Sequence, residues 1–360
     1  MCIKVVVLGA GGLVGERLID ALVAKTTFRV GGGLALPLSK IVLFDMRDLS
    51  ADLKVSDPRV SCVAGDLTDR RTLDKLFDPD GCTRVTVIQL AALLSGYAEA
   101  NFELGMKVNL HGAIGVMDAL RAVGDKLGGP QIYLFTSTDY VAAYNEDNKA
   151  APVSEESFRL SPVSYGVQKA CVELLLCDYS RKGFIDGRVG RLSAVLGRPG
   201  WSNSISWSYT GIFTQPLIGK DFEVPGVLPM DRPFPCSCVQ NNVASLLYLA
   251  SEVRGADLGH NRVVQIAAKS YTLSEIWAAC QKVAAAAGIA ADTLGKVTQG
   301  ALPKEATVTE LNVCPAVDCA KAEALGMPME VDIETIIADY VARHVKKEEE
   351  GEPEAKRQKA

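Results

Sequence analysis

The sequence predicts an α/β protein built on a doubly wound parallel β-sheet, followed by a smaller and mostly helical lobe. Short apolar runs rich in β-branched residues alternate with amphipathic helical patterns through the first two-thirds of the 360-residue chain. Runs that are apolar throughout are typical of strands covered on both faces of a parallel sheet. After residue 197, Pro, Gly, Ser and Trp become frequent and helical patterns dominate, which indicates a second lobe.

Six runs are strand candidates, at residues 3–9, 40–45, 59–66, 84–92, 131–137 and 187–197. We expect the stretch "TTFRVGGGLALPLS", before the second run, to be an extended loop. The tail at 346–360 is a run of charges without apolar periodicity, and we expect it to be disordered.

The composition excludes several classes of protein. The formal net charge is −5, with 48% hydrophobic and 22% charged residues, so nothing favours binding to nucleic acid or to an anionic membrane. No apolar run reaches the roughly 20 residues that span a bilayer, and "MCIKVVVLGA" does not resemble a secretory signal. The ten cysteines are scattered without zinc-ligand spacing. We therefore expect a cytoplasmic protein with reduced thiols and no metal.

A glycine-rich turn follows the first strand candidate. Gly9, Gly12 and Gly15 have the spacing G-x-x-G-x-x-G, and Leu13 and Val14 lie where the next helix begins. Glycine permits a tight turn and lets backbone N–H groups approach a pyrophosphate, which then faces the positive end of the helix dipole. The strand–turn–helix context predicts a dinucleotide site that includes all five residues.

The second strand candidate ends in a carboxylate, Asp45. At that position a carboxylate accepts hydrogen bonds from the adenosine ribose and repels a 2′-phosphate, so NAD is favoured over NADP. Arg47 could bind a 2′-phosphate if it turned inward, which leaves NADP open. Asp45 could equally be an ordinary residue of a strand-ending turn.

Two further strand ends extend the same crevice. Asp66, in "GDLTD", could bond the adenine amino group while Leu67 packs on the ring. Ala91 and Ala92 are small enough for the cofactor to pass. Because the carboxyl ends of parallel strands share one edge of a sheet, we expect these residues to lie together around the cofactor.

The fifth strand candidate leads into Thr138, and the next helical pattern carries Tyr165 and Lys169. Their i, i+4 spacing places both side chains on one helix face. Tyrosine is a poor base at its ordinary pKa of about 10. A neighbouring ammonium and the positive nicotinamide ring would stabilise its phenolate and lower that pKa. The pattern thus predicts hydride chemistry with Tyr165 as acid/base and Lys169 as its partner.

In this order, the glycine motif, "GDLTD", "LAA", "VN", "TST" and "YGVQK" resemble the extended short-chain dehydrogenase/reductases, also called the NAD-dependent epimerase/dehydratase family. The resemblance covers residues 1–345. It implies a Rossmann-type NAD-binding domain at 1–197 and a substrate-binding lobe at 198–345, with some return to the sheet. Two departures are "QLAA", where His often precedes the alanines, and Thr instead of Ser at 138.

The resemblance also implies roles for single residues. Thr138 would orient the substrate, and Asn109 would support Lys169 through water. Leu192, at the end of the last strand candidate, would contact the cofactor. The family further implies a homodimer formed through the helices that carry Asn109 and Tyr165.

Within the family, "SYGVQKACVELLLCDYSRKGFIDGRVGRL" and the following "GRPGWSNS" resemble the subgroup that oxidises D-erythronate, a four-carbon sugar acid, at C2. Arg198 could pair with a substrate carboxylate through two parallel hydrogen bonds, or it could be a surface loop residue. Trp201 stands where that subgroup has a lysine, so the identity of the acid stays open.

Two other functions remain as alternatives. A nucleotide-sugar epimerase or dehydratase would use the same residues while keeping NAD bound through the whole cycle. A redox-sensing regulator would bind NAD(H) without chemistry, but such proteins typically lose the tyrosine or the lysine, and both are present here. The sequence therefore favours an NAD-dependent dehydrogenase acting on a small hydroxy acid.

Overall fold

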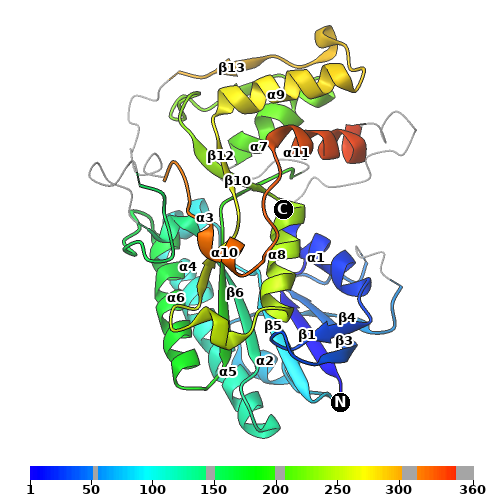
Figure 1. Cartoon of the computed structure of the whole chain (residues 1–360), viewed down its shortest axis with the longest axis vertical. Helices are drawn as coiled ribbons and strands as arrows, with labels where there is room; N and C mark the ends of the chain where they lie inside the picture. The colour runs from blue at the N-terminus through cyan, green and yellow to red at the C-terminus, as the bar shows by residue number, and fades with distance from the viewer. Residues whose placement is uncertain (52–55, 143–150, 199–206, 302–313, 346–360) are drawn as a thin grey trace.

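The computed structural model describes residues 1–51, 56–142, 151–198, 207–301 and 314–345. Its main sheet has eight strands in the order β11–β7–β6–β5–β1–β3–β2, with β4 paired to β3 (Figure 1). The strands are β1 (Ile3–Leu8), β2 (Thr27–Arg29), β3 (Ala35–Asp45), β4 (Val60–Ala64), β5 (Arg84–Gln89), β6 (Ile132–Thr138), β7 (Asp186–Leu192) and β11 (Val263–Gln265). All these pairings are parallel except β2 with β3. The predicted doubly wound α/β sheet is confirmed.

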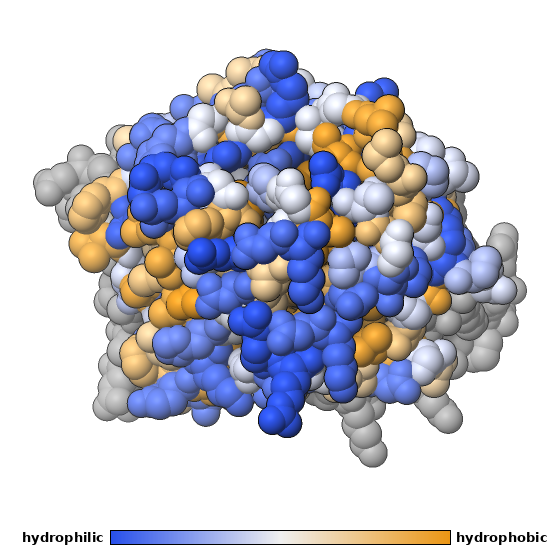
Figure 2. Space-filling view, turned by 90° about the horizontal axis from the view of Figure 1, so that it is seen from below, coloured by the Kyte–Doolittle hydropathy of each residue, from blue (hydrophilic) through white to orange (hydrophobic). Residues whose placement is uncertain are grey.

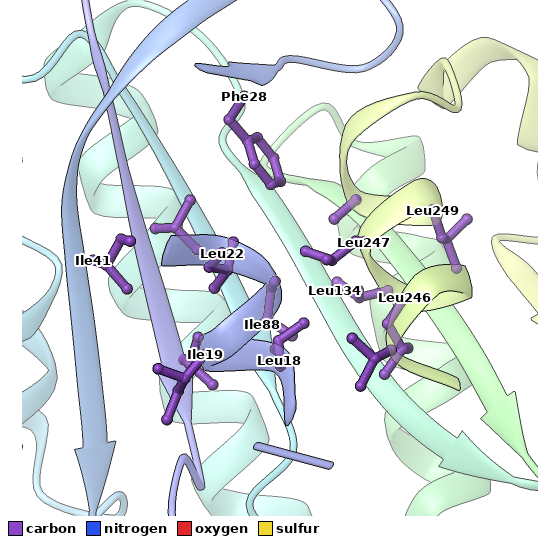
Figure 3. Close-up of a cluster of buried hydrophobic side chains, with 14 of the residues drawn as sticks. Leu18, Ile19, Leu22, Phe28, Ile41, Ile88, Leu134, Leu246, Leu247 and Leu249 are labelled. Atoms are coloured by element: carbon purple, nitrogen blue, oxygen red, sulfur yellow. The ribbon is translucent and has the colours of Figure 1, made fainter. Parts of the chain in front are cut away.

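Helices cover both faces of the main sheet. On one face, α1 (Leu13–Val23) and α8 (Val239–Ser251) pack on a core that includes Leu18, Ile88, Leu134 and Leu246 (Figure 3). On the other face, a second core is formed with α2 (Arg70–Leu76), α5 (Gly112–Leu127) and α6 (Ser164–Arg181). Burial of apolar surface on both faces explains why these strands read as continuous apolar runs.

The expectation of an extended loop before the second strand is wrong. Strand β2 and the first part of β3 form an antiparallel hairpin, with Phe28 opposite Leu36. Both of these side chains are buried, and the turn between the strands contains Gly31 and Gly32 with positive φ. The alternation of buried and exposed residues is the signal of a hairpin here.

The expectation of one strand at 187–197 is also wrong. The chain leaves the main sheet after Leu192, and Ala194–Leu196 form β8, which pairs with β10 (Phe234–Cys238) in a separate three-stranded sheet with β12 (Lys269–Tyr271). The apolar run is continuous because both strands are largely buried, although they belong to different sheets.

The upper part of the molecule in Figure 1 has a core of its own. It contains α7 (Trp207–Thr214), α9 (Leu273–Ala286) and α11 (Ile333–Tyr340), together with β8, β10 and a two-stranded sheet of β9 (Phe222–Val224) and β13 (Val297–Gln299). This part therefore has more strand than the expected mostly helical lobe. Strand β11 is part of the main sheet, and helix α8 packs on that sheet, although both come after residue 198. The cores of the main sheet and the core of the upper part are therefore built from alternating segments of the chain.

Shorter helices connect these elements: α3 (Ser95–Ala100), α4 (Phe102–Gly105), the π-helix η1 (Met106–His111), η2 (Asp139–Val141), η3 (Pro216–Ile218), η4 (Gly255–Leu258), η5 (Ala291–Thr293), α10 (Ala320–Ala324) and η7 (Val341–Val345). Hydrophilic residues predominate on the face seen from below in Figure 2. Within the described ranges, no helix combines the length and the apolar character that crossing a membrane requires. The charged tail at 346–360 lies outside the described residues.

Candidate active site

A cavity of about 510 Å³ lies at the carboxyl edge of the main sheet, beside α7 of the upper part. Strands β1, β3, β5, β6 and β7 all end at it, because parallel strands deliver their carboxyl ends to one edge. The predicted site residues that line it are Gly9, Gly12, Leu13, Val14, Gly15, Asp45, Asp66, Leu67, Ala91, Ala92, Thr138, Tyr165, Lys169, Leu192 and Arg198. Of the predicted site residues, Asn109 alone is absent from the lining.

The glycine turn is as tight as the motif requires. Gly9 has a φ of +83°, and a Cβ there would lie 2.5 Å from the backbone nitrogen of Ala91. A Cβ on Gly15 would lie 2.5 Å from the carbonyl oxygen of Ala10. Gly12 is the N-cap of α1 and provides no side-chain cap, so the first N–H groups of the helix are left for an anion. These features fit a dinucleotide pyrophosphate.

At the adenosine end, Asp45 is tied to the glycine turn. Its Oδ2 accepts a hydrogen bond of 2.9 Å from the backbone N–H of Gly11, and Arg47 donates to the Gly11 carbonyl at 3.5 Å. Ionised Asp45 still has lone pairs for ribose hydroxyls. The Arg47 guanidinium therefore lies beside Asp45 and the glycine turn.

Asp66 lies at the next strand end and is held in a local turn. Its Oδ1 accepts from the backbone N–H and the hydroxyl of Thr68, each at 2.8 Å, and Lys107 approaches Oδ2 at 3.5 Å. The Thr68 hydrogen bonds, followed by Lys107, lower the pKa of Asp66. Asp66 is thus a fixed anion that can accept from an amino group.

Lys169 is almost fully buried, 1% exposed. Its ammonium donates to the Thr136 carbonyl at 2.8 Å and lies 5.7 Å from the centre of the Tyr165 ring. Burial lowers its pKa to about 7, and the carboxylate of Glu173, one helical turn further on, opposes that shift. Whether Lys169 is protonated at neutral pH therefore depends on nearby negative charges such as Glu173.

The pKa of Tyr165 is raised in the protein alone, first by burial and then by the carboxylate of Asp139. An activated tyrosine needs the opposite shift. The nicotinamide ring, positive in its oxidised form, is the second cation that the expected lowering requires. Tyr165 and Lys169 thus have the expected placement, whereas the chain by itself does not lower the tyrosine pKa.

Asn109 does not line the cavity. It lies in the π-helix η1, and its amide exchanges hydrogen bonds with the backbone of Leu93, at 2.8 and 3.0 Å. The same side chain donates to Gln168 at 2.8 Å. Asn109 therefore connects the loop after β5 to the residue before Lys169. A water bridge from Asn109 to Lys169 stays a prediction.

Asp139 is a cavity residue to which sequence reasoning gave no role. It follows Thr138 directly, is only 2% exposed, and lines the cavity. Burial raises its pKa to about 6. The motif "FTSTD" displayed this carboxylate, but only the folded structure shows that it is buried beside Tyr165.

Arg198 lines the cavity, as do Trp207 and Thr210 of α7. Burial lowers the pKa of Arg198, and the carboxylate of Glu16 in the first turn of α1 opposes that shift. The guanidinium is therefore within electrostatic reach of the first turn of α1. Trp201 lies outside the described residues.

The described residues contain no group of three or more His, Cys, Asp or Glu side chains arranged to hold a metal ion.

Comparison with known proteins agrees with this geometry. The sequence model of the NAD dependent epimerase/dehydratase family matches residues 5–215. The D-erythronate dehydrogenase of Cupriavidus necator is 35% identical over 342 residues, which are 94% of this chain and 98% of that protein. The D-erythronate dehydrogenase of Haemophilus influenzae is 30% identical over 62% of this chain and 64% of that protein.

Among solved structures, a nucleoside-diphosphate-sugar epimerase from Agrobacterium tumefaciens superposes with a TM-score of 0.81 at 28% identity, covering 96% of this chain and 95% of that one. The matched family model spans more than half of the chain and includes the glycine turn, Tyr165 and Lys169. The chain therefore belongs to the NAD dependent epimerase/dehydratase family, and it is an NAD-dependent enzyme.

Proposed function

We propose that this enzyme is a dehydrogenase that oxidises a small hydroxy acid of the D-erythronate kind. One observation carries the proposal: Thr138, Tyr165 and Lys169 meet in the same cavity as the residues suited to NAD. The relative named D-erythronate dehydrogenase, similar over almost its whole length, supports the choice of substrate class.

NAD supplies the hydride acceptor. With NAD bound to accept the hydride from the alcohol carbon, the Tyr165 phenolate oxygen would take the hydroxyl proton, and the product would be a 2-oxo acid. Lys169 faces the Tyr165 ring from a buried position fixed by the Thr136 carbonyl. Its pKa of about 7 would rise beside a phenolate, so a negative Tyr165 and a positive Lys169 stabilise each other.

Arg198 is the proposed partner of the substrate carboxylate. A guanidinium can hold a carboxylate by two parallel hydrogen bonds, which a lysine cannot do. Because Arg198 is near Glu16 and the start of α1, the cofactor pyrophosphate is an alternative anion for it to bind. If Arg198 binds the acid, Arg198→Lys raises the KM for the acid and leaves the Kd for NADH unchanged. A weaker Kd for NADH would assign it to the pyrophosphate.

The deciding experiment is incubation with NAD and a panel of hydroxy acids of three to five carbons, D-erythronate included. Reduced cofactor is followed by its absorbance. We expect net NADH in equal amount to acid consumed. No NADH with any acid would contradict the proposal.

A nucleotide-sugar epimerase is the second candidate, favoured by the structural likeness to the Agrobacterium tumefaciens epimerase. An epimerase returns the hydride to its substrate, so it interconverts sugars without net NADH. Incubation with nucleoside-diphosphate sugars, followed by product separation, distinguishes the two reactions.

The remaining proposals concern organisation. Residues 1–197 would form most of the NAD-binding domain, and the core around α7, α9 and α11 would form the substrate-binding part. A cytoplasmic location and a role in carbohydrate metabolism accord with a sugar-acid substrate. A homodimer is proposed through α3, α4, α6 and η1, where large apolar side chains are exposed on neighbouring helices.

A further inference from the structure

The buried carboxylate of Asp139 has an unusual set of contacts for a group beside a reaction site. Its Oδ1 lies 3.2 Å from the Thr138 hydroxyl, and its Oδ2 is buried with no hydrogen-bond partner among the described residues. The Ser193 hydroxyl lies close enough to this side chain to lower its pKa, against the larger effect of burial. A buried carboxylate oxygen without a donor is costly unless the group is protonated or a ligand supplies the donor.

The charged and titratable groups around Asp139 come from four other parts of the chain. Arg191 of β7 favours the carboxylate form, but its guanidinium is bound to Glu173 at 2.7 and 2.8 Å. Tyr165 of α6, Cys236 of β10 and Cys314 also face Asp139, which raises the pKa of each. These three groups are neutral when protonated, so the one cation that acts on Asp139 among the described residues is Arg191, which is already bound to Glu173.

The Thr138 hydroxyl has one proton and two lone pairs. It accepts a hydrogen bond from the backbone N–H of Tyr140 at 3.2 Å, which occupies one lone pair. If Asp139 is ionised, the only Thr138 proton is donated to it, and Thr138 can offer the substrate nothing but a lone pair. If Asp139 is protonated, it can donate to Thr138, whose own proton is then available to the substrate oxygen.

We propose that Asp139 is a positioning residue that sets, by its protonation state, whether Thr138 donates to the reacting oxygen or only accepts from it. The two reaction directions differ in what they need. A substrate carbonyl oxygen can only accept, so reduction requires Thr138 as donor. An alcohol can both donate and accept, so oxidation tolerates either arrangement. This inference rests on the proposed dehydrogenase function.

The test measures kcat/KM for reduction of the 2-oxo acid by NADH, from about pH 5 to pH 8, on either side of the Asp139 pKa of about 6. Wild type should lose roughly 10²-fold across this range, the usual effect of one donor to a developing oxyanion. Asp139→Asn keeps a permanent N–H donor and should lose the part of this step that is centred near pH 6, whereas any step from Lys169 near pH 7 stays in both proteins. Thr138→Val keeps the shape without the hydroxyl and should be slow at every pH.

The effects of Asp139→Asn and Thr138→Val should not add in the double variant, because one residue acts through the other. Additive losses, or the same pH step in wild type and Thr138→Val, would overturn the inference. The Thr138→Val comparison remains decisive if Asp139→Asn does not fold.

An infrared titration of the protein without substrate separates this inference from the proposed function. We expect a protonated-carboxyl band that titrates in wild type and is missing from Asp139→Asn. If the band titrates but neither the acids nor their oxo products react, the proposed function alone is overturned. If the acid turns over but no such band titrates, the inference about Asp139 is overturned.

Discussion

At the scale of single residues, the proposed acid/base role of Tyr165 depends on charges brought by other groups. Tyr165→Phe keeps the ring and removes the only oxygen proposed to take the proton. Turnover should fall by roughly 10²–10⁴, while the Kd for NADH, measured by fluorescence, stays unchanged. Tyr248→Phe is the matched control, since its hydroxyl donates a hydrogen bond to the Leu325 carbonyl and Tyr248 does not line the cavity among the described residues. Near-normal kcat in Tyr165→Phe would remove Tyr165 from the mechanism.

Asp45 has two functions that a substitution must separate. It supports the glycine turn through Gly11 and is expected to exclude a 2′-phosphate by its charge. Asp45→Asn keeps an oxygen acceptor for the Gly11 N–H but removes the charge. Asp45→Asn should therefore reduce the preference for NAD over NADP, measured as the ratio of the two kcat/KM values. Asp45→Ala should in addition weaken the binding of NAD. Equal use of both cofactors by wild type would contradict the assignment.

The buried Lys169 predicts a dependence of stability on pH. Its pKa is about 7 in the folded protein against an ordinary lysine value of 10.5, so the unfolded chain binds more protons between these two values. Stability should rise with pH in that window. Lys169→Met removes this contribution, so the gain in unfolding free energy from pH 7 to pH 9 should be smaller in the variant by up to about 3 kcal/mol. Urea unfolding at both pH values measures it, and parallel curves would contradict it.

At the scale of elements, local sequence signals predicted the parallel strands and the glycine turn because both depend on neighbouring residues. The hairpin of β2 and β3 was not predicted because the three successive glycines from Gly31 are typical of a loop. The alternating pattern around Phe28 and Leu36 was present. The break after Leu192 had no local signal, since it depends on which distant strand each half pairs with.

The turn between β1 and α1 gives a matched pair of glycine substitutions. Gly15→Ala would place its Cβ 2.5 Å from the Ala10 carbonyl oxygen, which forces the helix away from the turn. Both the melting temperature and NADH affinity should fall. Gly12→Ala would place its Cβ 3.6 Å from the nearest atom, the Gly9 carbonyl oxygen, at a φ of −86°. This variant should keep the melting temperature and weaken only the binding of NADH, because Gly12 lines the cavity. Equal melting temperatures for both variants would contradict this reading.

At the scale of the whole molecule, most of the candidate site was predictable because a parallel sheet gathers its carboxyl ends at one edge. Fifteen predicted residues line one cavity for that reason. The contributions of Asp139 and Ser193 were not predictable, since their burial and their proximity come from tertiary packing. The small sheets of the upper part were missed because strands such as β8 and β12 are three residues long and pair across long stretches of sequence.

The outer face formed by α3, α4 and α6 predicts how two copies associate. Tyr97, Phe102, Leu104, Val167 and Leu174 are between 44% and 57% exposed there, on helices that contact one another. Large apolar side chains gathered on one monomer surface are typical of an interaction site. A twofold dimer buries the same patch on both copies, which needs no other partner.

Leu174→Glu puts a charge into the proposed interface. We expect the mass in solution, measured by light scattering during gel filtration, to fall from two chains to one, with the melting temperature of the monomer then depending less on protein concentration. Leu34→Glu is the matched control, because Leu34 is 67% exposed in the turn between β2 and β3, away from these helices. A wild-type monomer at all concentrations, or a dimer that Leu174→Glu leaves intact, would show that α6 does not form the interface.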